Sequence, residues 1–148
     1  SCLMKNEPNY LIKDLADKTG LSHNTIRFYE KKQLIQPSFR GSNNYRYYND
    51  DALKRLLFIK RCRALDMTLK EIQSLIALEQ NPEQDCSAVN NLIAEHLQHV
   101  ESRIAELLTF RLQLQQLRQS CSAQSTVNQC QILKKLETAD EQACSAAK

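Results

Sequence analysis

Apolar residues near the start of the chain recur at helical spacing in short segments that end at turn or capping residues. The spacing over residues 12–19 predicts a helix, and Gly20 supplies the left-handed or tight-turn residue that ends it. Residues 10–12 fit either a short strand or the lead-in to this helix. Ser22 is placed as the N-cap of a second helix over residues 22–32. Two short helices joined at a glycine predict a helix-turn-helix.

A turn-rich loop and a β-prone segment come next. Residues 36–44 are rich in Pro, Gly, Ser and Asn, and residues 45–48 read Tyr-Arg-Tyr-Tyr, so together they predict a wing. Asn49 or Asp50 then caps a helix over residues 51–65, which has apolar faces and an outer surface of Lys and Arg.

A capping box marks the start of the fourth predicted helix. Thr68 is its N-cap and Glu71 completes the box, so the helix covers residues 69–78 and ends before Pro82. These elements, in this order, predict a winged helix-turn-helix domain over residues 10–80.

The longest predicted element is a helix over residues 85–120, which Asp85 is placed to cap and which contains neither Gly nor Pro. Steps of three and four between its apolar residues are typical of a coiled-coil seam. The alternative is an amphipathic helix that folds back on its own winged domain. The predicted dimer seam consists of Ile93, Leu97, Val100, Ile104, Leu107, Phe110 and Leu114.

The length of this helix decides how its ends can meet. At 1.5 Å per residue, Cys86 and Cys121 stand roughly 50 Å apart, so one chain cannot bring them together. In an antiparallel pair of chains, Cys86 of one lies beside Cys121 of the other. The same register sets Ile93 against Leu114 and places Ile104 near the two-fold axis. The seam is nearly palindromic about its midpoint, as a symmetric antiparallel dimer requires.

Positive charge and tyrosine are concentrated in the N-terminal part of the chain. Residues 1–63 contain 13 Lys and Arg against 6 Asp and Glu, whereas residues 64–148 contain 7 against 11. All five Tyr lie within residues 10–48. Such a surface favours binding to nucleic-acid phosphates, although a solvated basic face with core aromatics has the same composition.

Glycine is scarce in the 148 residues, with Gly20 and Gly41 the only two. Gly-rich phosphate-binding loops and the G-x-S-x-G nucleophile elbow are therefore impossible. No nucleophile with a matching base emerges, so an enzyme is not predicted. No apolar run approaches the ~18 residues of a membrane span and no secretory signal is evident, which predicts a cytoplasmic protein without a membrane partner.

Six cysteines in a cytoplasmic protein indicate metal or redox chemistry more than a disulfide framework. Cys62 lies on a helix between basic residues and is interpreted as a packed thiol. Cys2 and Cys144 fall in tails of small or polar residues, and residues 138–148 are expected to be disordered. The candidate ligands are Cys86, Cys121 and Cys130.

These three cysteines suit one site for a soft metal ion. Cys86 is in the first turn of the long helix, where the helix dipole favours thiolate over thiol. Residues 121–137 predict a metal-binding loop between Cys121 and Cys130 and, behind it, a helix of one or two turns. In the antiparallel dimer, two such sites form, each with two cysteines from one chain and Cys86 from its partner. The alternative is three incidental reduced cysteines.

All-sulfur ligation selects soft ions over Mg, Ca or Mn. Three thiolates suit lead(II) or mercury(II), and cadmium(II) can add water or another residue. Zinc usually takes four ligands and no fourth is evident, so zinc is the weaker candidate. His96 and His99, three residues apart on the long helix, are candidate ligands of a second site or hydrogen-bonding groups at the seam.

The N-terminal segments, in this order, resemble the MerR family of metal- and stress-responsive transcription regulators, and the likeness extends over about residues 10–137. The resembling segments are residues 12–16 (IKDLA), 25–30 (TIRFYE), 44–48 (NYRYY) and 58–66 (FIKRCRALD). The resemblance implies that Arg27 and its neighbours enter the major groove and that the wing, above all Arg46, contacts phosphates. The predicted DNA-contacting residues are Ser22, Asn24, Thr25, Arg27, Tyr29, Arg40, Tyr45, Arg46 and Tyr48.

The C-terminal half resembles the lead- and cadmium-responsive branch of this family. The resembling segments are residues 85–90 (DCSAVN), 95–96 (EH), 99–104 (HVESRI) and Cys121 and Cys130 ahead of Ile132. The C-x8-C spacing is closer to lead or mercury sensors than to cadmium sensors, whose loop is shorter. Lead(II) is therefore predicted first, and cadmium(II) or mercury(II) next.

Together these observations predict a mainly α-helical, homodimeric, metal-responsive regulator that binds a palindromic promoter element in the bacterial cytoplasm, associated with the nucleoid. The resemblance implies that the metal-bound form distorts promoter DNA so that RNA polymerase can engage, at a cost on the order of 1–6 kcal/mol. Two alternatives stay open. One is a thiol-based redox regulator that pairs Cys121 with Cys130, and the other is a metal-sequestering coiled coil with no DNA target.

Overall fold

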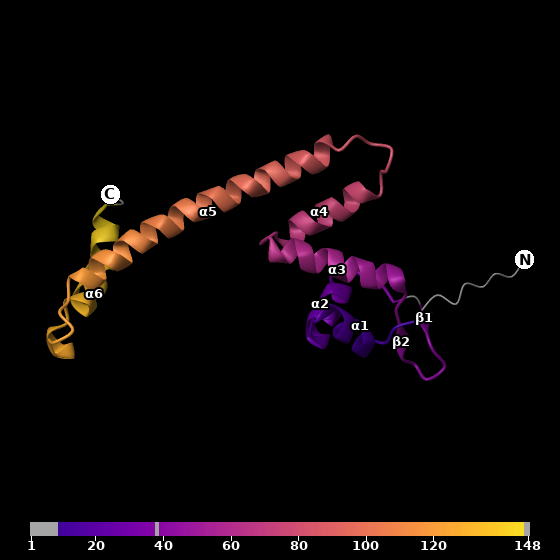
Figure 1. Cartoon of the computed structure of the whole chain (residues 1–148), viewed down its shortest axis with the longest axis horizontal. Helices are drawn as coiled ribbons and strands as arrows, with labels where there is room; N and C mark the ends of the chain where they lie inside the picture. Colours follow the sequence, from indigo (N-terminus) through magenta and orange to yellow (C-terminus); the bar gives the residue numbers. More distant parts are fainter. Residues whose placement is uncertain (1–8, 38, 147–148) are drawn as a thin grey trace, which may run out of the picture. The chain divides into compact units, whose positions relative to one another are not determined.

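The computed structural model describes residues 9–37 and 39–146, with side chains up to residue 138. The fold is mainly α-helical with a small two-stranded wing, which confirms the predicted class (Figure 1). The chain divides into two compact units between Leu92 and Ile93. The elements are α1 (Ile12–Thr19), α2 (His23–Lys31), β1 (Phe39–Arg40), β2 (Arg46–Tyr47), α3 (Asp50–Ala64), α4 (Leu69–Glu79), α5 (Ser87–Gln119), the 3-10 turn η1 (Val127–Gln129) and α6 (Gln131–Ala146).

The predicted helix-turn-helix is formed by α1 and α2, and local hydrogen bonds fix its boundaries. Gly20 ends α1 with a φ of 73°, a left-handed conformation that favours glycine. Ser22 caps α2, because its hydroxyl accepts a hydrogen bond from the Thr25 N–H at 3.1 Å. Lys60 of α3 donates to the carbonyl of Thr19 at the end of α1. This cation at a helix C-terminus complements the helix dipole and ties α1 to α3.

The predicted wing is a short antiparallel hairpin. In its register, Phe39 pairs with Tyr47 and Arg40 pairs with Arg46. An isolated bridge joins the wing to the start of the chain, where the backbones of Tyr10 and Tyr48 exchange two hydrogen bonds of 2.7 Å. Residues 10–12 thus satisfy both predicted alternatives, since Tyr10 makes a strand-like bridge and α1 begins at Ile12.

The caps predicted for α3 and α4 are also present. The side chain of Asn49 accepts a hydrogen bond from the Ala52 N–H at 3.1 Å, so Asn49 rather than Asp50 caps α3. Thr68 and Glu71 form the reciprocal capping box, with distances of 3.1 and 3.0 Å. Side chain-to-backbone bonds of this kind satisfy donors that a helix start leaves unpaired.

The core of the first unit lies between α1–α4 and the base of the wing. Cys62 is buried in it, as predicted for a packed thiol, and this burial raises the pKa of the thiol. The buried apolar residues are Leu15, Ile26, Tyr29, Leu34, Ile35, Tyr48, Ala52, Leu56, Ile59, Cys62, Met67 and Ile72. Leu92 from the first turns of α5 packs against this cluster.

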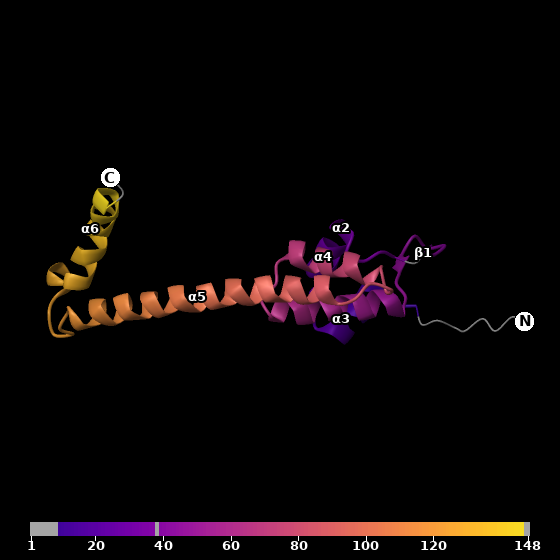
Figure 2. The ribbon, with the colours of Figure 1, turned by 90° about the horizontal axis from the view of Figure 1, so that it is seen from above.

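The long helix α5 contains 33 residues. Its ribbon is continuous from end to end (Figures 1 and 2). Asp85 accepts hydrogen bonds from the backbone and the hydroxyl of Ser87, in agreement with its predicted capping role. Although α5 is long, no helix in the described ranges is also apolar enough to cross a membrane.

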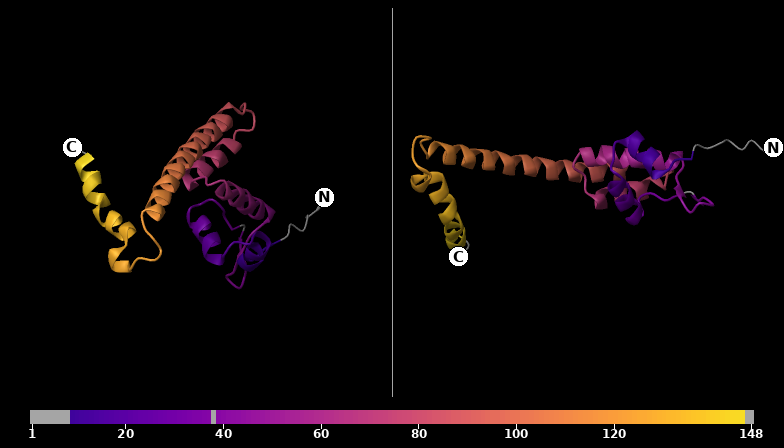
Figure 3. Two further views of the ribbon diagram at one scale, coloured as in Figure 1. Left: turned by 60° about the vertical axis from the view of Figure 1, so that its left-hand side comes forward. Right: turned by 90° about the horizontal axis from the view of Figure 1, so that it is seen from below.

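The helix after the loop is longer than predicted (Figure 3). The sequence suggested one or two turns up to residue 137 and a disordered tail, but α6 continues to Ala146. Three of the nine residues from 138 to 146 are alanine and no Gly or Pro interrupts the segment, so helix propensity favours continuation. Cys2 and the side chain of Cys144 lie outside the described part of the chain.

Candidate functional site

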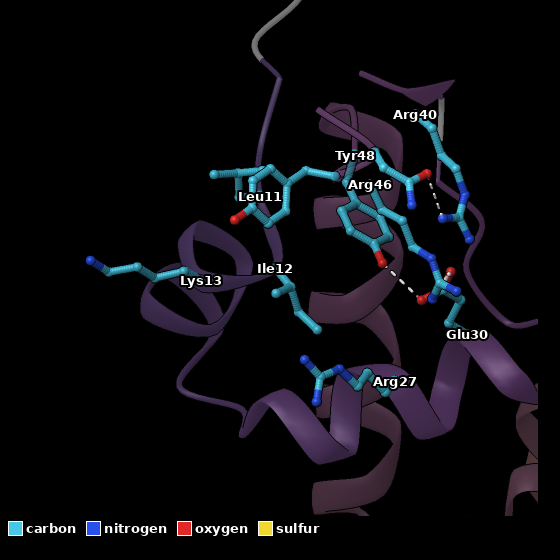
Figure 4. A pocket seen from close by; sticks show the side chains of 10 residues that line it. Leu11, Ile12, Lys13, Arg27, Glu30, Arg40, Arg46 and Tyr48 are labelled. Carbon is cyan, nitrogen blue, oxygen red and sulfur yellow. Dashed lines mark hydrogen bonds and ion pairs between the residues drawn. The ribbon is translucent and has the colours of Figure 1, made fainter. Parts of the chain in front are cut away.

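A hollow in the first unit collects most of the predicted DNA-contacting residues. It lies between α1, α2 and the wing (Figure 4). Its lining residues are Leu11, Ile12, Lys13, Arg27, Glu30, Arg40, Asn44, Tyr45, Arg46 and Tyr48. Four of them are cations and one is an anion, so the hollow carries excess positive charge, as a surface for a polyanion requires.

The four positively charged side chains of the hollow come from four different elements. Arg27 comes from α2, Arg40 and Arg46 come from the two strands, and Lys13 comes from α1. Arg40 donates a hydrogen bond to the side chain of Asn44 at 3.2 Å. Among the described residues, none forms a hydrogen bond or ion pair with Arg27. Its guanidinium is therefore available to a ligand.

Two of the residues predicted to contact DNA, Tyr29 and Tyr48, are part of the hydrophobic core. Tyr29 is 7% exposed and Tyr48 is 1% exposed, so their rings pack inward. The hydroxyl of Tyr48 donates to Glu30 at 2.8 Å, and burial together with this carboxylate raises the pKa of Tyr48 to about 12. The rings of these two tyrosines thus serve the core, and the contact with DNA predicted for them stays a prediction. Tyr45, in contrast, is 62% exposed at the hollow.

The start of α2 presents the remaining predicted contacts. Asn24 and Arg27 are exposed on this helix. The hydroxyls of Ser22 and Thr25 lie 2.8 Å apart, and the Ser22 hydroxyl also caps the helix. Sequence reasoning missed Glu30, because its place at this site depends on a contact with Arg46 of the distant wing.

A second candidate site lies in the loop after α5. The Sγ atoms of Cys121 and Cys130 are 3.5 Å apart. The Ser125 hydroxyl is also 3.5 Å from the Cys121 sulfur. Hydrogen bonds from Ser125 and Cys130, and then from the first backbone N–H groups of α6, lower the pKa of Cys121. The loop therefore holds two thiols side by side and favours the thiolate of one.

The spacing of these two sulfurs fits a shared metal ion. Two sulfurs that each lie about 2.3 Å from one zinc ion at tetrahedral angles are about 3.8 Å apart, close to the observed separation. A larger soft ion needs only a small opening of the pair. Two thiolates of one chain leave further coordination positions for a third ligand.

Cys86, the third predicted ligand, directly precedes α5. It is exposed, and its carbonyl accepts the hydrogen bond of the Asn90 N–H at 2.9 Å in the first turn. The structure brings Cys121 and Cys130 together, whereas the 33 residues of α5, about 50 Å of helix, follow Cys86 before that loop begins. His96 and His99 lie one turn apart on α5, and their predicted ligand role stays a prediction.

The predicted dimer seam is a row of exposed apolar side chains on α5. Ile93, Leu97, Ile104, Leu107, Phe110 and Leu114 are between 44% and 64% exposed in the single chain, and Val100 is half-buried. Leu108 and Leu112 add to the exposed apolar area. A contiguous apolar surface of this kind marks an interaction site.

Comparisons with known proteins place the chain in a family of DNA-binding regulators. Residues 10–79 match the family model for MerR HTH family regulatory proteins, and residues 53–117 match the model for MerR, DNA binding. The transcriptional regulator ZntR of Escherichia coli strain K12 is 37% identical over 131 residues, which cover 86% of this chain and 92% of ZntR.

Solved structures give the same result. PbrR691 of Ralstonia metallidurans CH34, in complex with lead(II), has a TM-score of 0.73 and 41% identity and covers 86% of this chain and 98% of its own. HiNmlR, a MerR family regulator that lacks the sensor domain and is bound to promoter DNA, has a TM-score of 0.52 and 26% identity, with coverages of 76% and 88%.

The fold and the basic hollow define a winged helix-turn-helix protein that binds DNA. The chain belongs to the MerR family of transcriptional regulators. The relatives are regulators, which confirms the prediction that the chain is not an enzyme.

Proposed function

We propose that the protein is a metal-responsive transcriptional activator that works as a homodimer on a palindromic promoter element. The observation that carries this proposal is the pair of thiols after α5, Cys121 and Cys130, held 3.5 Å apart. Cys86 of the partner subunit is the proposed third ligand. Each dimer then holds two sites, with one ion in each.

The dimer rests on the exposed seam of α5. Burying a Leu, Ile or Phe side chain is worth about 1.5–3 kcal/mol, so a row of these residues on both subunits provides a strong drive for pairing. The near palindrome of the seam favours the antiparallel arrangement, because the same surface then serves both subunits. The antiparallel arrangement also brings Cys86 close to the thiol loop, because the start of one α5 lies beside the end of the other.

Lead(II) is the first proposed effector, and cadmium(II) or mercury(II) comes next. The donor set contains only sulfur, which favours soft ions. PbrR691, which shares 41% identity with this chain, was solved with lead(II). Within the described loop, no further cysteine or histidine accompanies the thiol pair, so a four-coordinate zinc site is less well supported.

DNA binding is proposed to use the hollow of the first unit. Arg27 and Asn24 are exposed on α2 for the major groove, and Arg40, Tyr45 and Arg46 reach phosphates from the wing. Ser22 and Thr25 extend the same surface. RNA polymerase is the proposed partner at the promoter, where the metal-loaded dimer distorts the DNA. The bacterial cytoplasm, on the nucleoid, is the proposed location.

A metal titration of the reduced protein tests this function. We expect lead(II), cadmium(II) and mercury(II) to give thiolate-to-metal absorbance with two ions per dimer, and promoter transcription to rise over the same range. Zinc(II) and copper(I) serve as comparison ions. Metal binding without any change in transcription, together with no salt-dependent DNA affinity, would instead indicate a sequestering protein.

A second function is favoured by the same thiol pair. Two sulfurs at 3.5 Å need only a small movement to form a disulfide, which supports a redox-responsive regulator on this scaffold. Activation of transcription by hydrogen peroxide in metal-free buffer would favour this alternative. The proposed metal sensor should stay inactive under that treatment.

A further inference from the structure

One carboxylate lies in the cationic hollow, at the point where the recognition helix meets the wing. Glu30, near the C-terminal end of α2, accepts a hydrogen bond from Arg46 through one oxygen at 3.1 Å and from the Tyr48 hydroxyl through the other at 2.8 Å. Figure 4 shows the three side chains together. Both carboxylate oxygens are therefore engaged with the wing side of the hollow.

The charge of Glu30 is unfavourable for a surface that binds DNA, because it repels phosphates. The position of Glu30 nevertheless fixes the orientation of the Arg46 side chain. The Glu30 side chain is only 13% exposed, whereas the Arg46 side chain is 46% exposed. The buried carboxylate therefore accepts a hydrogen bond from one N–H of the Arg46 guanidinium. The other N–H groups of this guanidinium stay accessible to a phosphate.

This ion pair links two surfaces that must contact DNA together. Arg46 belongs to β2, and Glu30 belongs to α2, which also carries Arg27. Tyr48 is fixed in turn by its backbone bridge to Tyr10. The ion pair fixes the orientation of the Arg46 guanidinium relative to α2. This guanidinium therefore reaches a DNA phosphate only when α2 lies in the major groove.

We propose that Glu30 is a positioning residue that makes the phosphate contact of Arg46 conditional on correct docking of α2, and thereby raises the specificity of DNA binding. The proposal rests on the DNA-binding function assigned above. On unrelated DNA, Arg46 stays paired with Glu30 and releases few counterions. On the operator, the preset direction of Arg46 saves the entropy of ordering a long side chain.

The substitution Glu30→Gln tests the proposal, because it removes the charge and keeps the shape. The probes are a duplex enriched by the wild-type protein from a random-sequence pool and a scrambled duplex of the same composition. We expect the salt dependence on scrambled DNA to steepen by about 0.9 in log K against log salt, which corresponds to one additional phosphate contact. The ratio of affinities for selected over scrambled DNA should fall about two- to fivefold, the scale of one partly exposed ion pair.

Two controls separate this role from others. Glu83→Gln makes the same charge change at an exposed position of the same unit, and it should leave the slope and the ratio unchanged. In an Arg46→Ala background, Glu30→Gln should no longer change the slope. Equal effects of Glu30→Gln and Glu83→Gln would overturn the proposal, as would a parallel loss of affinity for both duplexes. Failure of the wild-type protein to enrich any duplex would instead refute the DNA-binding function itself.

Discussion

Replacing Cys86 with serine is expected to abolish metal-induced transcription and to leave promoter affinity within about twofold of wild type. The substitution removes one of three proposed thiolates, and a hydroxyl is a poor ligand for a soft ion. Since the loss of an outer-shell partner alone lowers metal affinity about 10–100-fold, loss of a direct ligand should exceed that range. Promoter transcription with graded lead(II), measured together with the DNA dissociation constant, checks both parts.

Cys62→Ala is the matched control for this experiment. Cys62 is buried in the first unit, far in sequence from the thiol loop, and it is not a proposed ligand. The variant should retain induction at the same lead(II) concentration, even if its unfolding temperature falls. Full induction by Cys86→Ser, or its loss in the control, would refute the assignment of Cys86.

Replacing Ile104 with aspartate is expected to dissociate the dimer. Ile104 is 52% exposed in the single chain and lies near the proposed two-fold axis, so the substitution places two carboxylates close together in an apolar seam. Loss of two buried isoleucines alone corresponds to about 3–6 kcal/mol, or at least a 100-fold rise in the dimer dissociation constant. Sedimentation equilibrium measures this constant directly.

Gln98→Asp introduces the same charge on the same helix at an exposed position outside the seam. This control should remain dimeric and should bind promoter DNA normally. A dimeric Ile104→Asp variant would show that the seam is not the interface.

Local chemistry made much of the fold predictable from the sequence. Gly20, Ser22, Asn49 and the capping box at Thr68 each act on neighbouring backbone groups, and each helix boundary they indicated is found within a residue or two. The spacing of the cysteines also predicted the loop that brings Cys121 and Cys130 together, because the two ends of a short polar loop can lie close to each other.

The features that sequence reasoning missed depend on tertiary contacts. Tyr29 and Tyr48 are placed among aromatic residues of a basic segment, yet packing rather than composition decides that they point inward. The link from Glu30 to Arg46 joins residues 16 positions apart across the hollow, so no local pattern reveals it. The length of α6 also differs from the one or two turns predicted, because the end of a helix without Gly or Pro has no clear local signal in the sequence.

The central claim, that each metal site is built from two subunits, is tested most directly by a mixed dimer. One subunit carries Cys86→Ser, and the other carries Cys121→Ser and Cys130→Ser, with different affinity tags so that only the heterodimer is isolated. Sites shared between subunits leave one complete set of three thiolates in this heterodimer, and sites within one chain leave none. We expect the heterodimer to bind one lead(II) ion with the wild-type thiolate absorbance band, while each parent homodimer lacks that band. A heterodimer with no more absorbance than its parents would contradict the account.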